Sequence, residues 1–200
     1  MPKQIVYFTK YARNGASSRL RSYQYIDLLQ NEPNVKITVQ NLFPASYIKN
    51  LYANSSTKKI ALLGYLKRLL FLFTVFKYDK IIIEKELFPY FPAFFEWIFK
   101  MLNIKYMVDY DDAIFHNYDQ HPNVFVQKIL KNKIKKVMQF ADVVMVGNQY
   151  LANYATQAQA KQIVLVPTVI DLNRYPIKNF SGNDKIIIGW IGTPKTIKLF

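Results

Sequence analysis

Short apolar runs alternate with helical segments along most of this 200-residue chain. Runs of four or five apolar residues between polar ones are typical of buried strands, and apolar residues three or four positions apart are typical of helices. The predicted strands are 4–8, 35–39, 80–83, 105–109, 143–146 and 163–166, and the predicted helices include 18–29, 60–76, 93–102, 124–140 and a segment through 150. Strands and helices that alternate in this way form parallel sheets. The sequence therefore predicts an α/β fold, a Rossmann-like doubly wound parallel sheet.

A cluster of carboxylates follows one of these strands. The apolar residues 104–108 lead directly into Asp109, Tyr110, Asp111 and Asp112. Ligands of open parallel sheets bind at the carboxyl ends of the strands, and adjacent carboxylates repel one another, which makes such a cluster costly on an ordinary surface. We expect these residues to form the floor of an active site; the alternative is a turn with an Asp helix cap.

The loop after the first strand is a second candidate binding segment. Gly15 lets the backbone approach a ligand, the start of the helix exposes unpaired N–H groups, and Arg19 and Arg21 add positive charge. These features suit a diphosphate, and an ordinary turn with solvated arginines has the same composition. Ser17 or Ser18 is the expected helix cap. No Gly-x-Gly-x-x-Gly or Walker pattern is present, which disfavours hydride transfer and ATP hydrolysis.

The chain is strongly basic and contains no cysteine. It has 27 Lys and Arg residues against 13 Asp and Glu, a formal net charge of +14, which favours anionic partners. The absence of cysteine excludes disulfides and thiolate chemistry, and two histidines are too few for a zinc set. The N-terminal residues 1–9 have the character of a short strand and lack the features of a signal peptide, so we expect a cytoplasmic protein.

Residues 60–76 are rich in Leu, Phe and Tyr, but Lys67 and Arg68 interrupt them. A membrane span needs about 20 mainly apolar residues, so this segment is too short. It fits an amphipathic helix in the interface of an anionic membrane, and equally a helix whose apolar face covers the sheet. Lys58 and Lys59 before it, and Lys77 after it, suit the membrane interpretation.

The C-terminal part predicts the start of a second unit. Residues 174–184 lack apolar periodicity and have the character of a linker, and 186–190 form a new apolar run that turns at Gly192 and Thr193. We predict a domain over 1–183 with the linker at its end, and the beginning of a second domain over 184–200. The alternative is that this last strand pairs at the edge of the first sheet.

Four segments carry a resemblance to a known family. They are Gly15-Ala16-Ser17-Ser18-Arg19-Leu20-Arg21, Ile83-Glu84-Lys85-Glu86, Asp109-Tyr110-Asp111-Asp112-Ala113-Ile114-Phe115 and Gly189-Trp190-Ile191-Gly192-Thr193-Pro194. In this order they resemble bacterial family 4 glycosyltransferases of the GT-B fold. The resemblance implies the N-terminal, acceptor-binding half of an enzyme with two Rossmann-like halves, inactive as an isolated half.

The implied reaction is a retaining transfer of sugar from a nucleotide sugar to a lipid-linked or polysaccharide acceptor substrate in cell-envelope glycan biosynthesis. The resemblance implies no obligatory metal, and a peripheral location on the inner face of the plasma membrane. Asp111 and Asp112 are the expected catalytic residues, because a carboxylate can accept the proton of a sugar hydroxyl. The remaining candidate site residues are Gly15, Arg19, Gly192 and Thr193 for the donor phosphates, and Arg21, Glu86 and His116 for the acceptor substrate. For Glu86 and His116, solvated loop positions are the alternative.

Two other functions compete with this one. Asp109 and Asp111 match the metal-binding Asp-x-Asp of GT-A glycosyltransferases, which would predict a mixed sheet and a divalent ion on the donor phosphates. A non-catalytic basic module would use lysines of the predicted helix 124–140 to bind membrane or nucleic acid; these are Lys128, Lys131, Lys133, Lys135 and Lys136. We expect no nucleic-acid partner, because no recognition motif accompanies the charge.

Overall fold

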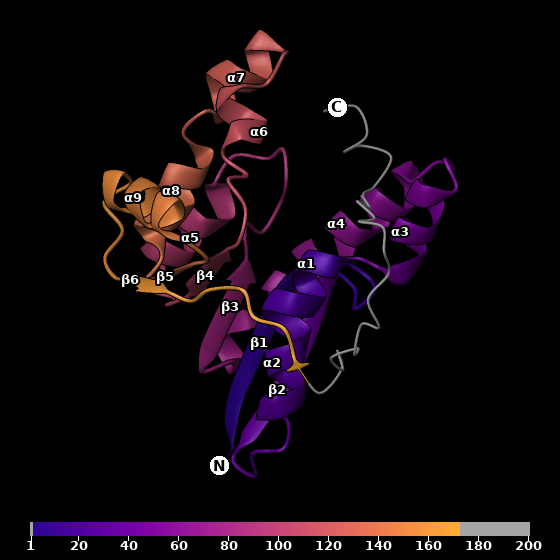
Figure 1. Cartoon of the computed structure of the whole chain (residues 1–200), viewed down its shortest axis with the longest axis vertical. Helices are drawn as coiled ribbons and strands as arrows, with labels where there is room; N and C mark the ends of the chain where they lie inside the picture. The colour runs from indigo at the N-terminus through magenta and orange to yellow at the C-terminus, as the bar shows by residue number, and fades with distance from the viewer. Residues whose placement is uncertain (1, 173–200) are drawn as a thin grey trace, which may run out of the picture. The chain divides into compact units, whose positions relative to one another are not determined.

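The computed structural model describes residues 2–172 of the chain (Figure 1). The chain divides into one compact unit over Met1–Val169 and another over Ile170–Phe200. The predicted linker and the predicted second domain, including Gly192 and Thr193, lie outside the described residues and stay predictions. The fold described below is that of the first unit.

Six parallel strands form one sheet. In sheet order they are β2 (Val35–Phe43), β1 (Lys3–Tyr11), β3 (Lys80–Glu84), β4 (Met107–Tyr110), β5 (Val143–Val146) and β6 (Ile163–Leu165). The chain moves from β1 to β2 in one direction and then crosses to β3 on the other side of β1. In doubly wound sheets this reversal, here between β1 and β3, is the topological switch point at which ligands bind. The predicted fold class is confirmed.

The helices differ from the predicted ones mainly at their breaks. They are α1 (Ala16–Ser18), the π-helical turn η1 (Arg19–Tyr23), α2 (Gln24–Leu29), α3 (Ala45–Tyr52), α4 (Lys58–Leu72), the 3₁₀ turn η2 (Val75–Lys77), α5 (Phe94–Met101), α6 (His116–Asp119), α7 (Val124–Leu130), α8 (Lys133–Phe140) and α9 (Gln149–Gln157). The single helix predicted over 124–140 is wrong, because the chain breaks between α7 and α8. The short helices α3 and α6 were not predicted.

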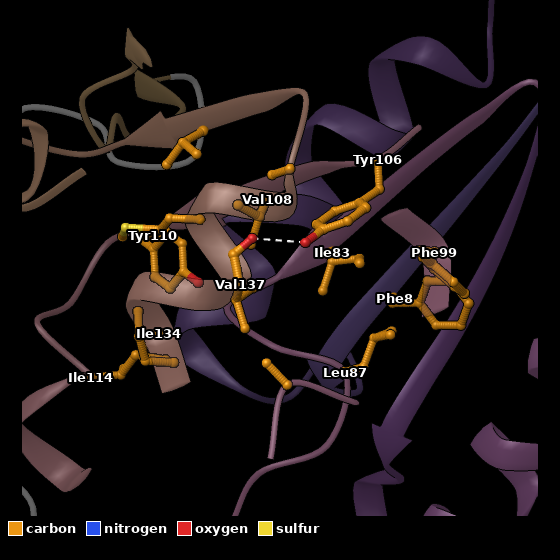
Figure 2. Close-up of a cluster of buried hydrophobic side chains, with 14 of the residues drawn as sticks. Phe8, Ile83, Leu87, Phe99, Tyr106, Val108, Tyr110, Ile114, Ile134 and Val137 are labelled. Atoms are coloured by element: carbon orange, nitrogen blue, oxygen red, sulfur yellow. Dashed lines mark hydrogen bonds between the residues drawn. The ribbon is translucent and has the colours of Figure 1, made fainter. Parts of the chain in front are cut away.

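The main core lies on one face of the sheet. A row of buried residues crosses four strands in register, with Phe8 paired to Ile83, Ile83 to Val108 and Val108 to Val144. Side chains from α4, α5, α8 and α9 cover this row. Figure 2 shows part of this core, in which the Tyr106 hydroxyl donates a 2.7 Å hydrogen bond to the Val137 carbonyl. Burying an apolar row of this kind contributes about 1.5–3 kcal/mol per large side chain.

The opposite face of the sheet carries a smaller core. Tyr7 on β1 packs there with Tyr23 and Ile26 from η1 and α2. Beyond these side chains, a largely apolar cavity of about 420 Å³ extends over the middle of the sheet and includes Met107 and Met145. Helical segments therefore lie on both faces, as a doubly wound sheet requires.

Candidate functional site

The carboxyl ends of β1, β3 and β4 bring the predicted site segments together. The Ser17 hydroxyl, two residues after Gly15, donates a 2.8 Å hydrogen bond to Asp111 Oδ2. The Ser18 hydroxyl donates a 2.9 Å hydrogen bond to Glu84 Oε1 and accepts one from the backbone N–H of Tyr11. The loop after β1 is thus tied to the ends of β3 and β4. The acidic cluster and the Gly15 loop therefore lie together at the carboxyl ends of the central strands, beside the switch point.

The first helix begins differently from the prediction. Gly15 is its N-cap, and neither Ser17 nor Ser18 caps it, because both hydroxyls are directed to carboxylates of other strands. Gly15 is required sterically: a Cβ at this position would lie 2.4 Å from the Cβ of Tyr11. Close packing therefore accounts for this glycine without a ligand.

Lys85 is the centre of the site. Its Nζ lies 2.9 Å from Asp111 Oδ1 and 2.8 Å from Asp112 Oδ2. Its backbone has a φ of 67°, a left-handed conformation that is uncommon for a residue other than Gly, Asn or Asp. Such conformations cost of order 1–3 kcal/mol and cluster at functional sites. The backbone of the chain is therefore strained where it presents this lysine to two carboxylates.

The ion pairs around Lys85 set the charges of the site. Burial by itself would raise the pKa of Asp111, but the ammonium of Lys85 and the hydrogen bond from Ser17 lower it below its ordinary value. Burial would likewise lower the pKa of Lys85, and the two carboxylates raise it well above the ordinary value. Both groups are therefore charged at neutral pH. Asp111 is a weak proton acceptor there, whereas the side chain of Asp112 is 66% exposed and can be reached by a substrate.

Asp109 has a structural partner. The guanidinium of Arg21 donates to both carboxylate oxygens of Asp109, and the two side chains are only 2% and 7% exposed. Arg21 also donates a 2.6 Å hydrogen bond to the carbonyl of Val166. The carboxylate of Asp109 is thus occupied by Arg21, and Asp109 does not share the predicted active-site floor with Asp111 and Asp112. The role of Arg21 in binding an acceptor substrate stays a prediction, and it would require this buried pair to open.

Glu86 is also buried, which contradicts the alternative of a solvated turn. It is 5% exposed, and it accepts a 2.8 Å hydrogen bond from the Tyr118 hydroxyl and forms an ion pair with Lys133. Lys133 in turn donates to the carbonyl of Phe88 at 2.6 Å. Lys133 therefore does not belong to an exposed lysine cluster, and that cluster is divided between α7 and α8.

The other predicted residues are placed separately. Arg19, on η1, is partly buried, and its side chain makes no hydrogen bond or ion pair within residues 2–172. His116 lies on α6, where it contacts Asp119 and Tyr150, and no hydrogen bond or ion pair joins it to Asp111 or Asp112 in the described residues. Gly192 and Thr193 lie outside the described residues.

Sequence reasoning missed the importance of Lys85 and Glu84. Their signal was present, because Glu84, Lys85 and Glu86 follow the apolar run 81–83 as three consecutive charges. Charged residues immediately after a buried strand belong at the ligand-binding edge of a parallel sheet. Which of them would pair with which partner was not readable from the pattern.

The arrangement gives no structural support to the GT-A alternative. All six strands of the described sheet are parallel, which contradicts the mixed sheet that this alternative predicts. Asp109 and Asp111 are ion-paired with Arg21 and Lys85, and residues 2–172 hold no group of three or more His, Asp or Glu side chains that could bind a metal.

In the part of the chain that the structure describes, none of the helices has both the length and the apolar character needed to cross a bilayer.

Comparisons with known proteins give distant structural similarities to solved chains. No protein-family model matches the chain, and no curated protein matches it. The crystal structure of UGT73P12 from Glycyrrhiza uralensis, a plant UDP-glycosyltransferase complexed with glycyrrhetinic acid 3-O-monoglucuronide, resembles it with a TM-score of 0.43 and 10% sequence identity. The match covers 81% of this chain and 48% of that one, so the chain spans about half the length of the solved structure.

Proposed function

We propose that this chain is the acceptor-binding half of a GT-B glycosyltransferase, which transfers a sugar from a nucleotide sugar to a lipid-linked or polysaccharide acceptor substrate. The observation that carries the proposal is the group formed by Ser17, Lys85, Asp111 and Asp112 at the switch point. Three segments far apart in the sequence meet at Asp111, and Lys85 joins this group to the exposed carboxylate of Asp112. Such a group at such an edge supports binding and activation of a polar substrate.

Within this proposal each residue has a separate role. Asp112 accepts the proton of the attacking hydroxyl or orients it, since its carboxylate is exposed. Asp111, held by Ser17 and Lys85, fixes the position of that lysine and therefore of Asp112. Arg19 and the start of α1 face the departing diphosphate, whose negative charge is the main quantity to be stabilised in a retaining transfer. The part of Gly192 and Thr193 in binding the donor phosphates belongs to the same proposal, and both residues lie outside the described part of the chain.

The test is an assay of the polypeptide encoded by the complete reading frame, with a panel of nucleotide sugars and with glycan and lipid-linked acceptors. Asp112→Asn should lower kcat about 100-fold or more with little change in KM for the donor, because it removes a proton acceptor but no donor contact. Glu32→Gln, which neutralises an exposed carboxylate just before β2 and therefore at the amino end of the sheet, is the control and should leave kcat unchanged. Wild-type kcat in Asp112→Asn would refute the assignment.

The proposal includes docking to an anionic membrane, on the cytoplasmic side of the plasma membrane. One side of α4 is buried against the sheet through Gly64, Arg68 and Leu72, so the helix does cover the core. Its other side exposes apolar side chains, among them Leu62 at 71% and Phe73 at 76% exposure. Both interpretations of the segment 60–76 are therefore compatible with the structure.

Neighbouring α5 extends the same apolar surface. Phe94, Trp97 and Met101 are exposed on this helix. Between α4 and α5 lies a cavity of about 280 Å³ with an almost wholly apolar lining. Exposed lysines lie on these two helices or close to their ends in the sequence. They are Lys58, Lys59, Lys67, Lys77 and Lys100. Exposed apolar side chains combined with lysines are the pattern of a helix that inserts into the interface of an anionic bilayer.

A further inference from the structure

A third cavity lies between α6, the beginning of α8 and α9. Its volume is about 530 Å³, within the range of small-molecule sites. None of the residues that hold Asp111 and Asp112 lines it. The lining consists of Phe115, His116, Asp119, Lys131, Asn132, Lys135, Tyr150, Asn153, Tyr154 and Gln157.

The aromatic part of the cavity is held in place by packing and hydrogen bonds. The rings of Phe115 and Tyr154 stack with centroids 3.7 Å apart and planes within 4°. His116 links Asp119 to Tyr150, with Nδ1 3.0 Å from Asp119 Oδ1 and Nε2 2.9 Å from the Tyr150 hydroxyl. In the tautomer with the proton on Nδ1, the imidazole donates to the Asp119 carboxylate and accepts from the Tyr150 hydroxyl at Nε2. Two tyrosine rings are therefore fixed at a surface where side chains are ordinarily free.

The charged part of the cavity has unbalanced positive charge. Lys131 and Lys135 are four residues apart and both line it, and neither forms an ion pair within residues 2–172. Asp119 is the cavity's one carboxylate among these lining residues, and it is engaged by His116. Lys131 is the C-cap of α7 and Lys135 lies on α8, so the two ammonium groups come from either side of the break between these helices. Neighbouring ammonium groups repel each other, and an anion between them offsets that repulsion. The ligand that fits this wall carries a negative charge.

The amide part of the cavity favours hydroxyl groups. Asn132, Asn153 and Gln157 each offer a donor and an acceptor. The carbonyl of Asn153 accepts from Gln149 at 2.9 Å, which orients its amide nitrogen for donation. Groups that both donate and accept, placed beside aromatic rings, suit a ligand whose hydroxyls alternate with apolar C–H surface.

We propose that this cavity binds an acidic carbohydrate, a sugar ring bearing a carboxylate or a phosphate. The anion lies between Lys131 and Lys135, the hydroxyls bond to the three amides, and the ring packs against the exposed Tyr150. The site is separate from the transfer reaction proposed above and does not depend on it, because it uses other residues and requires no turnover.

The test measures binding to the 200-residue chain by titration calorimetry with four probes: glucuronate, glucose 6-phosphate, glucose and inorganic phosphate. Glucuronate or glucose 6-phosphate should bind at least about tenfold more tightly than glucose and than inorganic phosphate, since only the acidic sugars can contact both the two lysines and the three amides. The stronger of the two identifies the anionic group. Equal affinity for phosphate and the acidic sugars would overturn the proposal, as would the absence of binding by both sugars.

Matched variants localise the site. Lys135→Met should weaken binding of the better sugar about tenfold or more, and Tyr150→Phe should weaken it about threefold by freeing His116 from its hydrogen bond. Lys136→Met removes the same charge from the same helix outside the cavity, and should change affinity less than twofold. Equal losses in Lys135→Met and Lys136→Met would show diffuse electrostatics and refute the site. Displacement of the sugar by a short oligonucleotide, weakened equally by both variants, would favour a nucleic-acid surface instead.

Discussion

Three carboxylates within four residues have three different environments. Asp109 is buried against Arg21, Asp111 is shared between Ser17 and Lys85, and Asp112 is exposed with one ion pair. Asp109 belongs to the buried structure, Asp111 forms the ion pair with Lys85 inside the site, and Asp112 is available to a ligand. Their environments differ because a different basic side chain reaches each carboxylate. Burial of an ion pair determines how much free energy of unfolding is lost when one partner is removed.

Removal of Arg21 should destabilise the fold strongly and in a pH-dependent way. Arg21→Met leaves a buried carboxylate without a partner, which should lower the free energy of unfolding by about 3–5 kcal/mol at pH 7.5. Burial already raises the pKa of Asp109 although Arg21 opposes it, and in the variant this pKa should rise further. A raised folded-state pKa means that stability is lost as pH rises through that pKa, so the deficit should shrink towards pH 5.

Urea denaturation at the two pH values measures this effect. Arg13→Met, which removes an exposed pair with Asp27 whose side chains are 54% and 48% exposed, is the control and should cost about 0–1 kcal/mol at both. A deficit of Arg21→Met that is equal at pH 5 and pH 7.5 would contradict the assignment.

At the scale of elements, α4 lies unusually close to β2. A Cβ on Gly64 would lie 2.2 Å from the carbonyl oxygen of Leu42, so the helix can approach the strand only with glycine there. Four residues on, Arg68 is fully buried and donates to Gln40 Oε1 at 2.7 Å and to the carbonyl of Leu87 at 3.0 Å. Arg68 thus joins the helix to the sheet and does not interrupt its packing.

Gly64→Ala should therefore destabilise the protein although alanine is the better helix former. Higher helix propensity would contribute about 1 kcal/mol, whereas forcing a backbone contact of this kind costs about 1–3 kcal/mol or more. We expect a lower midpoint in thermal unfolding followed by circular dichroism. Gly147→Ala is the control, because its Cβ would meet Asp111 Cα at an ordinary 3.5 Å. A raised midpoint for Gly64→Ala would show that α4 can move away from the strand.

At the scale of the whole molecule, the positive charge serves different surfaces. The net charge of +14 includes exposed lysines near α4 and α5, Lys131 and Lys135 beside the cavity between α6, α8 and α9, and buried lysines with carboxylate partners such as Lys85 and Lys133. The buried ones are neutralised locally. The exposed ones near the apolar side of α4 remain available to an anionic bilayer.

Membrane docking should be visible by flotation with vesicles. The chain should float with vesicles containing about 30% anionic lipid and less with neutral ones, and high salt should weaken the association because exposed charges are screened. Phe73→Glu should abolish most of this binding, since it places a carboxylate in the apolar surface. Phe125→Glu, at an equally exposed aromatic position on α7, is the control. Equal flotation of both variants would exclude α4 as the docking surface.

The local sequence by itself determined most of the elements, the parallel sheet, and the carboxyl ends of the strands as the place where the Gly15 loop, Asp111 and Asp112 lie. It did not show the break between α7 and α8 or the short helices α3 and α6. Periodicity over a few residues encodes burial of a strand or helix, and alternation of the two leaves few topologies open. Only the tertiary structure determined which charged side chains form ion pairs with one another. Arg21 and Asp109 are 88 residues apart, and the break after α7 lets Lys133 pair with Glu86. Such pairings depend on the register of distant strands and helices, which local patterns do not contain, so the charges of the site became visible only in the folded chain.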